Sequence, residues 1–554
     1  MDQERVPVLI IGGGIVGLSA SLFLSRQGIA SLLVERHQGT SIHPRARGVN
    51  GRTMELYREL GLEEAIREAG KELSPSFGIY KARTLKEVIE PLPRRTEPHA
   101  FPGTAFFDQL SPAAGNRVTQ DLLEPVLLAE ARRRGGDLRF YTEMVSFEQD
   151  ESGVTAVLRE RATGTESTVR ADYMIAADGA GSRVRQQLGV EVSGRGSLGH
   201  LLNILFRADL REFVRDREFS ICLIEQAEVR GLFTSINNSD RWVFHLSYDP
   251  TRGQKPEDFP PARCRELLRL ALGMPEIEIE ILSILPWECA ARVVEGFQQG
   301  RVFLAGDAAH QMPPWGGQGA NTGVQDAHNL AWKLAAVLKG QASSALLATY
   351  DSERRPVGAT ATEESAARAG EYGLLKMQPV AQAAMSLLNK PVLGKVMRKM
   401  GEKNIPKLLG YGYRYHSASI LEDGHANRTT GDLDGTPGTR VPHAWVERQG
   451  QRLSTLDLGG GGFALLAGSE GAAWCEQARA VAASLRIELT ACTIGPAGDL
   501  RDPQAGWQKS AGLSASGALL VRPDGFVAWR ARQASADGQQ ELARVLKQVL
   551  CRPA

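Results

Sequence analysis

The sequence predicts an α/β protein in three parts: a parallel α/β unit divided along the chain, a β-rich segment inserted into it, and a smaller α/β unit at the C-terminus. Three observations support this. A glycine-rich turn joins an apolar run to a helical pattern near the N-terminus, short alternating runs fill about 189–284, and strand and helix patterns alternate again after residue 430. Alternating strands and helices are typical of parallel sheets, and period-two alternation is typical of strands with one buried face.

Composition narrows the class of protein. The 554 residues include 65 basic and 64 acidic side chains, and a net charge of +1 gives no electrostatic case for a nucleic-acid or membrane partner. The six cysteines contain no CxxC pair, so we expect neither a zinc site nor a dithiol redox centre, and we expect no other metal site. Reduced cysteines and the absence of a signal-peptide pattern predict a cytoplasmic location.

The first motif is a strand, turn, helix, strand and acid between Val8 and Glu35. Val8–Ile11 suits a strand buried on both faces, and apolar residues recur at helical spacing from Ile15 to Arg26. The turn between them carries the pattern G-x-G-x-x-G, made of Gly12, Gly14 and Gly17. Such a turn lets the backbone approach a diphosphate at a helix N-terminus, and Glu35 can accept hydrogen bonds from a ribose. The unit predicts an ADP-containing dinucleotide but does not separate FAD from NAD.

Two later motifs favour FAD. In "YMIAADGAGSRVRQQLGV" an apolar run leads to Asp178, and in "GRVFLAGDAAHQMPPWGGQGANTG" a strand at Val302–Ala305 leads to Asp307 and a loop rich in proline and glycine. An acid at a strand end, beside a glycine-rich loop and a helix N-terminus, can bind a polyol and an electron-rich ring edge together. Because FAD has a ribityl chain and NAD has none, we favour FAD over a flavin-free NAD-dependent dehydrogenase. The alternative for Asp307 is a simple helix cap.

The three motifs resemble those of the single-component flavin-dependent aromatic hydroxylases built on the p-hydroxybenzoate hydroxylase fold. The resemblance runs from Val6 to about Ala366 and rests on "DGAGSRVR" and "GDAAH…PPWGGQGANTG…DAHNLAWKL" in the expected order. Within the family, the chain is most similar to tailoring hydroxylases of aromatic polyketides of the tetracenomycin, angucycline and rubromycin type, and to RebC. The resemblance implies a Rossmann-like FAD-binding domain with an inserted β-sheet substrate domain.

The resemblance also implies roles for residues. Gly12, Gly14 and Gly17 would meet the FAD diphosphate, with Arg45 or alternatively Arg47 nearby, and Glu35 would meet the adenosine ribose. Gln120, assisted by Arg117, and Asp307 would contact the ribityl region. Pro313 and Pro314 would line the flavin, whose pyrimidine edge would receive backbone N–H groups of Gly319, Ala320 and Asn321. Arg36 and Asp178 are counted with the cofactor-binding residues.

The chemistry implied is that of a monooxygenase. NAD(P)H would reduce the flavin, O2 would add to give a C4a-hydroperoxide, and an electron-rich ring would take up one oxygen. The chain has no second unit of strand, glycine turn, helix, strand and acid, as expected in a family whose NAD(P)H docks without a domain of its own. We expect a polycyclic phenol or quinone as substrate. Baeyer–Villiger insertion, oxidative rearrangement and a flavin protein that merely holds a reactive aromatic intermediate stay open.

The middle segment is expected to cover the substrate. "GLFTSINNSDRWVFHLSY" predicts two strands around a turn, with Trp242 and Phe244 on one face and His245 on the other. We expect Trp242, Phe244 and Phe233 to form an apolar surface for a flat ligand. His245 is a candidate catalytic base, or a partly exposed strand histidine. Trp315 is a candidate for contact with flavin or substrate, or a residue that closes its loop.

The expected domains are 1–188 with 285–366 for FAD, 189–284 for the middle sheet, 367–430 as a helical segment, and 431–554. In the last domain, strands at Phe463–Leu466, Ile487–Thr490 and Ala518–Val521 alternate with helices, an order that resembles a thioredoxin-like domain. Since CxxC is absent, we expect this domain to be structural or to form a homodimer contact. A chain cut near residue 430 should then keep its flavin spectrum but lose solubility or dimerisation.

Overall fold

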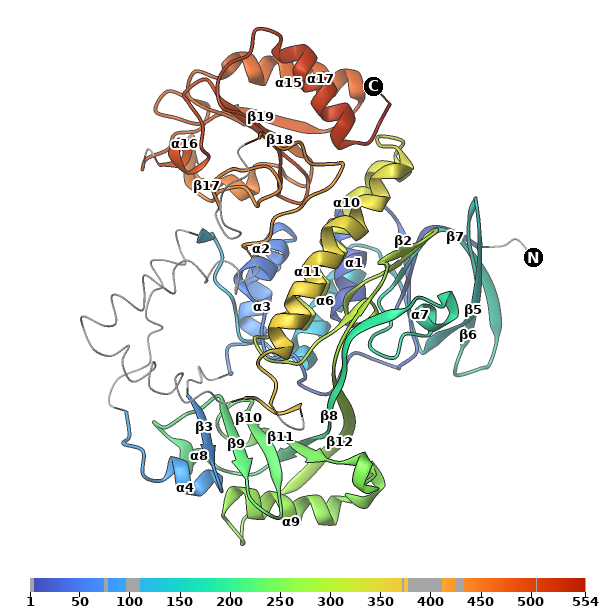
Figure 1. Ribbon diagram of the computed structural model, residues 1–554, viewed down its shortest axis with the longest axis vertical. Coiled ribbons are helices and arrows are strands. Elements are labelled where there is room, and N and C mark those ends of the chain that lie inside the picture. The colour runs from blue at the N-terminus through green and yellow to red at the C-terminus, as the bar shows by residue number, and fades with distance from the viewer. Residues whose placement is uncertain are drawn as a thin grey trace.

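An eight-stranded sheet forms the centre of the molecule (Figure 1). The computed structural model describes residues 4–73, 78–95, 110–370, 373–376, 411–424, 433–504 and 506–553. The main path of the sheet runs β13-β14-β7-β1-β2-β4, and the β14, β7, β1, β2 and β4 strands are parallel. Its strands are β1 (Glu4–Ile11), β2 (Ser31–Glu35), β4 (Asp137–Phe140), β5 (Thr142–Asp150), β6 (Gly153–Glu160), β7 (Glu166–Ala176), β13 (Gln298–Gln299) and β14 (Val302–Leu304).

Helices pack against this sheet through apolar side chains. The central strand β1 buries Val8–Ile11, as a strand covered on both faces requires. Helix α1 contacts both α6 and α10, and α10 also contacts α11. The helices of this part are α1 (Ile15–Arg26), α2 (Gly51–Glu59), α3 (Glu63–Ala69), α6 (Gln120–Arg133), α7 (Arg183–Leu188), α10 (Gln318–Leu338) and α11 (Thr349–Ala366), with 3-10 turns at Gly306–Ala308 and Ser344–Ala348.

A seven-stranded sheet in the order β15-β12-β8-β11-β10-β9-β3 forms the second layer. Its strands are β3 (Ile79–Ala82), β8 (Val192–Arg207), β9 (Ile221–Glu225), β10 (Arg230–Ser235), β11 (Arg241–Tyr248), β12 (Glu280–Val294) and β15 (His310–Gln311); its helices are α4 (Leu85–Ile89), α8 (Arg211–Val214) and α9 (Pro261–Leu272), with 3-10 turns at Pro250–Arg252 and Pro256–Asp258. The sheet extends past the expected span 189–284, because β3 joins it from the N-terminal region and β12 continues to Val294. The long β8–β12 ladder connects this layer to the central sheet (Figure 1).

One sequence prediction about this sheet is wrong. Trp242, Phe244 and Phe233 do not face a ligand; they are fully buried in a core that includes Leu267 and Leu268 of α9. Because successive strand residues point to opposite faces, His245 lies on the other face, toward the central sheet. We call this the inner face of the second sheet.

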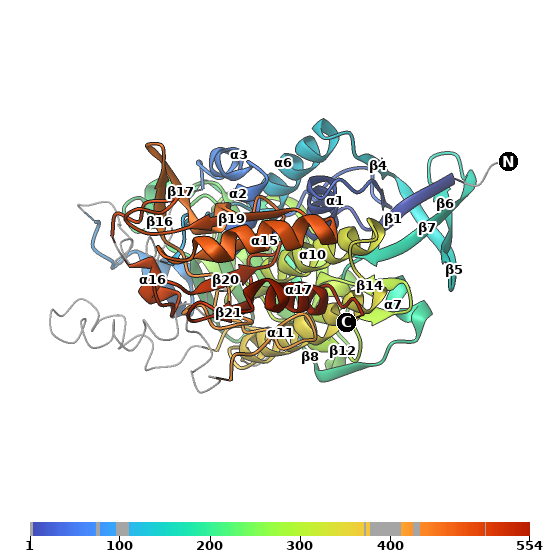
Figure 2. The same ribbon diagram turned by 90° about the horizontal axis from the view of Figure 1, so that it is seen from above.

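The C-terminal part has a four-stranded sheet in the order β19-β18-β20-β21, with β18 parallel to β19 and the other pairs antiparallel. This is the strand arrangement of a thioredoxin-like domain, and the predicted hairpin at Arg522–Gly525 joins β20 to β21. Helices α15 and α17 pack side by side on it (Figure 2). The elements are β16 (Trp445–Arg448), β17 (Gln451–Ser454), β18 (Phe463–Ala467), α15 (Ala472–Leu485), β19 (Leu489–Thr493), α16 (Trp507–Ser510), β20 (Ala518–Val521), β21 (Val527–Ala531) and α17 (Gly538–Val549), with a 3-10 turn at Thr455–Asp457.

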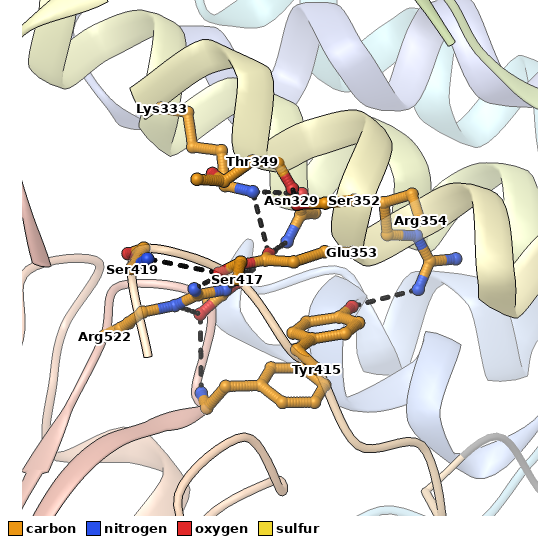
Figure 3. Close-up of polar contacts among 12 residues, drawn as sticks. Asn329, Lys333, Thr349, Ser352, Glu353, Arg354, Tyr415, Ser417, Ser419 and Arg522 are labelled. Atoms are coloured by element: carbon orange, nitrogen blue, oxygen red, sulfur yellow. Dashed lines mark hydrogen bonds and ion pairs between the residues drawn. The ribbon is translucent and has the colours of Figure 1, made fainter. Parts of the chain in front are cut away.

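A buried network of charges joins this domain to α10 and α11 (Figure 3). Glu353 accepts hydrogen bonds from Lys333 Nζ (2.7 Å) and from Arg522 Nη1 (2.6 Å) of the hairpin. Arg522 also pairs with Asp524 at 2.5 Å. All four side chains are inaccessible or nearly so. The network therefore fixes the C-terminal domain to the helices of the central domain.

Two expectations concern parts that the structure does not describe fully. The predicted helical segment 367–430 falls mostly outside the described residues, and the residue-level division into domains stays a prediction. Among the described helices, none is long and apolar enough to cross a membrane. No group of three or more potential metal ligands occurs in the described parts of the chain.

Candidate active site

The three sequence motifs meet at one edge of the central sheet. Strands β14, β7, β1 and β2 are parallel neighbours, so their carboxyl ends lie side by side. Asp307, Asp178, Gly12 and Glu35 follow or end these four strands, in that order across the sheet. We call this place the motif edge. In open α/β sheets, ligands bind outside the carboxyl ends of the strands.

The glycine turn at this edge has room for no side chain. Gly12 has φ +109°, and a Cβ atom there would lie 2.3 Å from the carbonyl oxygen of Ala177. A Cβ atom on Gly17 would lie 1.9 Å from the carbonyl oxygen of Gly12. The amide of Gly13 donates to Glu35 Oε2 (2.7 Å), so the turn and the acid at the end of β2 hold each other. The turn is thus compact, with its backbone at the start of α1.

Protein atoms surround the carboxyl of Asp307, although its side chain remains accessible to solvent. Its side chain is exposed to solvent, yet burial among protein atoms raises its pKa, partly offset by the nearby His310 and Arg45. We call this partly open place around Asp307 the recess. A Cβ atom on Gly319 would lie 4.0 Å from Asp307 Oδ1, which places the first turn of α10 at the same recess.

Asp178 is held at the start of α7. Its Oδ2 accepts from the amide of Val184 (3.3 Å), whereas its buried Oδ1 has no hydrogen-bond partner among the described residues. Burial raises the pKa of this carboxyl. Arg185 of the same helix donates to the carbonyl of Ala308 (3.0 Å), which ties the second motif to the third.

Two arginines lie close together beside the second sheet. Burial lowers the pKa of Arg47 to about 9, and the neighbouring Arg117 lowers it further. Burial also lowers the pKa of Arg117. Arg47 Nη1 is anchored on carbonyl oxygens of Ser220 and Ser235, both at 3.3 Å. Because these guanidinium groups have lost water on burial, an anionic ligand beside them would stabilise their charged form.

Two other predicted residues lie near the glycine turn. Gln120 begins α6 and donates to Glu124 Oε1 (2.7 Å), the atom that a Cβ on Gly14 would approach to 3.5 Å. Arg36 is exposed just beyond β2, where its carbonyl accepts from Arg161 (3.0 Å). The buried carboxyl of Glu124 could not be predicted from the sequence, because an acid on an amphipathic helix such as α6 normally faces solvent.

Helix α10 begins at the recess. Gly317 precedes it in the left-handed region (φ +64°), and Gly319, Ala320 and Asn321 form its first turn, whose amides a helix leaves without internal partners. Asn321 Oδ1 accepts from the amide of Asn50 (2.9 Å), which fixes this turn to the start of α2. Pro314 is exposed in the preceding loop.

Trp315, next to Pro314, is buried against the inner face of the second sheet, and its Nε1 has no partner in the described part of the chain. It packs in an apolar cluster with Leu201, Leu223, Leu232, Cys289 and Leu374. The loop that carries Trp315 therefore connects the recess to this apolar cluster.

Asp326 of α10 also belongs to the site, although its sequence position did not indicate a role. Its Oδ2 accepts from the amide of Gly306 (3.2 Å) and lies 2.7 Å from His310 Nε2, and its Oδ1 accepts from Arg354 (2.7 Å). Its carboxylate holds the loop that presents Asp307. In the sequence, Asp326 falls outside the apolar face formed by Val324, Ala327 and Ala331, a position that normally indicates a solvated acid.

The motif edge fits FAD in each of its parts. The glycine turn presents backbone N–H groups at the start of α1 to a diphosphate, arginines supply positive charge, and an accessible carboxyl beside a helix N-terminus suits a ribityl hydroxyl and a flavin edge. The buried, unpartnered Oδ1 of Asp178 is a further acceptor at the same edge.

Comparison with known proteins decides the family. The chain matches the FAD binding domain family over residues 5–365 and the C-terminal domain family of aromatic-ring hydroxylases over 434–553. The protein belongs to the FAD-dependent aromatic-ring hydroxylases. It is 41% identical to tetracenomycin A2 monooxygenase-dioxygenase of Streptomyces glaucescens, over 100% of this chain and 98% of that protein.

Solved structures agree with this hydroxylase assignment. Aklavinone-11 hydroxylase, in a ternary complex with FAD and aklavinone, has a TM-score of 0.85 and 39% identity, with all of both chains covered. The substrate-free rebeccamycin biosynthetic enzyme RebC has a TM-score of 0.76 and 30% identity, with 99% of each chain covered. The predicted fold class and the resemblance to polyketide tailoring hydroxylases are confirmed. This aromatic-ring hydroxylase is an FAD-dependent monooxygenase, which uses NAD(P)H as its reductant.

Proposed function

We propose that this monooxygenase hydroxylates an electron-rich polycyclic phenol or hydroxyquinone during the biosynthesis of an aromatic polyketide. The observation that carries the proposal is the inner face of the second sheet. There, an apolar cluster around Trp315 is bordered by the partly buried Ile221 and Trp287, and it lies near the polar residues His245 and Asn203. Such a surface suits a large flat ring system with hydroxyl groups. A curated relative named for tetracenomycin A2 and a solved relative in complex with aklavinone support the same class.

We further propose a placement for the cofactor. Gly12, Gly14 and Gly17 would face the FAD diphosphate with Arg45, and Glu35 and Arg36 would lie toward the adenosine end. Gln120, Arg117 and Asp307 would reach the ribityl chain. Gly319, Ala320, Asn321 and Pro314 would border the flavin ring, and Asp178 would serve the same edge. Arg47, which is anchored on the second sheet, would lie on the substrate side.

FAD, once bound and reduced by NAD(P)H, supplies the activated oxygen. The protein's own task is to hold the aromatic ring beside the flavin and to keep water out. Trp315 and its apolar neighbours exclude water, since they are nearly inaccessible. Arg47 would offer its positive charge and N–H donors to an oxygen of the substrate.

The test uses purified protein with NADPH and oxygen. We expect a yellow protein whose NADPH oxidation rises with a polycyclic hydroxyquinone and whose product gains one oxygen atom. Stimulation and hydroxylation with p-hydroxybenzoate alone would contradict the substrate class but not the flavin assignment. A product with an inserted ring oxygen would instead favour Baeyer–Villiger chemistry, and binding without turnover would favour a protein that holds an intermediate.

Two broader expectations belong to the same proposal. The cysteines are all free, five of them buried, which supports a reducing, cytoplasmic location. A homodimer is proposed as well, and light scattering of the FAD-loaded chain would measure its mass.

A further inference from the structure

His245 lies where a substrate would meet the second sheet. Its position on β11 is directly opposite Asn203 of β8 and Leu232 of β10. Leu232 belongs to the apolar cluster of Trp315, whereas His43 and Arg47 lie near His245 on the polar side. The imidazole therefore stands at the border between an apolar wall and the recess at the motif edge.

The hydrogen bond to Asn203 fixes the tautomer of His245. Nδ1 lies 2.6 Å from Asn203 Oδ1, and Asn203 is itself buried. With the amide oxygen of Asn203 facing the ring, Nδ1 carries the hydrogen, because a carbonyl oxygen only accepts. Nε2 is then the nitrogen with a free lone pair whenever the ring is neutral.

The surroundings keep the ring neutral. Burial, Arg47 and His43 together lower the pKa of His245 to about 3, so the imidazole carries no charge near pH 7. Nε2 has no hydrogen-bond partner among the described residues, and it is not one of their inaccessible polar atoms. An accessible acceptor therefore stands next to an apolar surface.

We propose that Nε2 of His245 accepts the hydrogen bond of a substrate hydroxyl and so orients the ring toward the flavin. This rests on the proposed function, and it adds the residue that selects for a hydroxyl group. Asn203 acts as a positioning residue, because it holds the acceptor lone pair in place. Arg47, whose charge also acts on His245, can donate to the oxygen of the same hydroxyl, which keeps its hydrogen for Nε2.

The experiment uses FAD-loaded protein and two flat probes, 2-hydroxyanthraquinone and anthraquinone, which differ by one hydroxyl. Binding is followed by the change in the flavin spectrum. His245→Leu removes the acceptor, His245→Gln restores an amide oxygen, and Ser247→Ala is a matched control two residues along the same face. We expect wild type and Ser247→Ala to prefer the hydroxylated probe.

For His245→Leu we expect about a three- to tenfold loss of affinity for 2-hydroxyanthraquinone, unchanged affinity for anthraquinone, and full FAD content. His245→Gln should recover part of the loss. Equal affinity of wild type for both probes, or no change in His245→Leu, would overturn the role of His245 and leave the proposed function standing. An equal loss for both probes would show a merely structural role. Failure of FAD-loaded wild type to bind either probe would overturn the polycyclic substrate class, and the assignment with it.

Discussion

Asp307 and Asp178 are carboxyl groups in surroundings that favour the neutral form. Burial raises the pKa of both, and one oxygen of Asp178 lies buried without a partner among the described residues. Buried acceptors of this kind normally have partners, and exceptions concentrate where a ligand completes the site. A cofactor with hydroxyl groups would supply the missing donors at both positions.

The Asp307→Asn substitution tests this at a single residue. It keeps the shape but replaces one carboxyl oxygen by an NH2 group, which cannot accept, so a hydrogen bond from a cofactor hydroxyl would be lost. We expect FAD binding to weaken by about 1–3 kcal/mol, roughly 5- to 150-fold in the dissociation constant, measured by flavin fluorescence. Asp209→Asn, at an exposed position, is the control. Unchanged retention of FAD would count against the proposed role.

His43 should make the protein sensitive to acid. Burial and then Arg45 lower its pKa to about 4, below the 6.5 of an exposed histidine. As the pH falls below 6.5, the unfolded chain takes up a proton that the folded chain refuses, so stability falls. At pH 5 the loss from His43 is about 2 kcal/mol relative to pH 7.

The check is the melting temperature at pH 7 and at pH 5, with FAD in excess. The difference between the two values should shrink in His43→Gln. Part of the difference should remain, because the pKa values of His245 and His443 are also lowered. The same pH response in wild type and variant would show that His43 titrates normally.

At the scale of elements, the glycine turn depends on close contact between α1 and β1. A methyl group on Gly17 would meet the backbone oxygen of Gly12 at 1.9 Å, and backbone cannot move aside as a flexible side chain can. We expect Gly17→Ala to destabilise the protein by about 1–3 kcal/mol and to reduce its FAD content. Gly181→Ala, with no atom within 4 Å, should change stability by less than about 0.5 kcal/mol. Similar FAD content and melting temperature in the two variants would refute this account.

Local patterns predicted the elements better than their faces. The β1–turn–α1 unit, the β10–β11 hairpin and the β20–β21 hairpin all follow from apolar periodicity and turn residues. The direction of the Trp242 side chain does not follow from these local patterns. It depends on α9, which is distant in sequence and covers that face with Leu267 and Leu268. Strand β19 lies slightly later than expected, at Leu489–Thr493. The apolar Ile487 was expected to begin the strand, but pairing with β18 begins only after the exposed Glu488.

At the scale of the molecule, the sequence predicted the motif residues and not those that hold them. Asp326 and Glu353 sit on helices where an acid is normally solvated, but Arg354 and Arg522 reach them from other elements. Such pairings depend on tertiary structure, which periodicity does not encode. The contacts with the C-terminal domain were missed for the same reason.

The buried network predicts a large effect of Glu353→Gln. Its loss leaves Lys333 without its ion-pair partner and Arg522 with Asp524 alone in that network. We expect a destabilisation of about 3–5 kcal/mol, read from denaturant unfolding. Glu363→Gln, on the same helix in an exposed ion pair with Arg195, should cost less than about 1 kcal/mol. A mild effect at Glu353 would mean that the network adds little to stability.

The network also changes what we expect of a chain that ends near residue 432. From the sequence, such a chain should keep its flavin spectrum. In the structure, the end of α10 packs Trp332 and Ala336 into the core of the C-terminal domain, and α10 begins beside Asp307. Truncation would expose that apolar surface and remove Arg522 and Asp524 from the charges on α10 and α11. We therefore expect the truncated chain to aggregate and to lose FAD, as measured by the ratio of flavin to protein absorbance in the soluble fraction. A soluble, yellow truncated protein with a full complement of FAD would show that the helices hold the flavin site without the domain that covers their far ends.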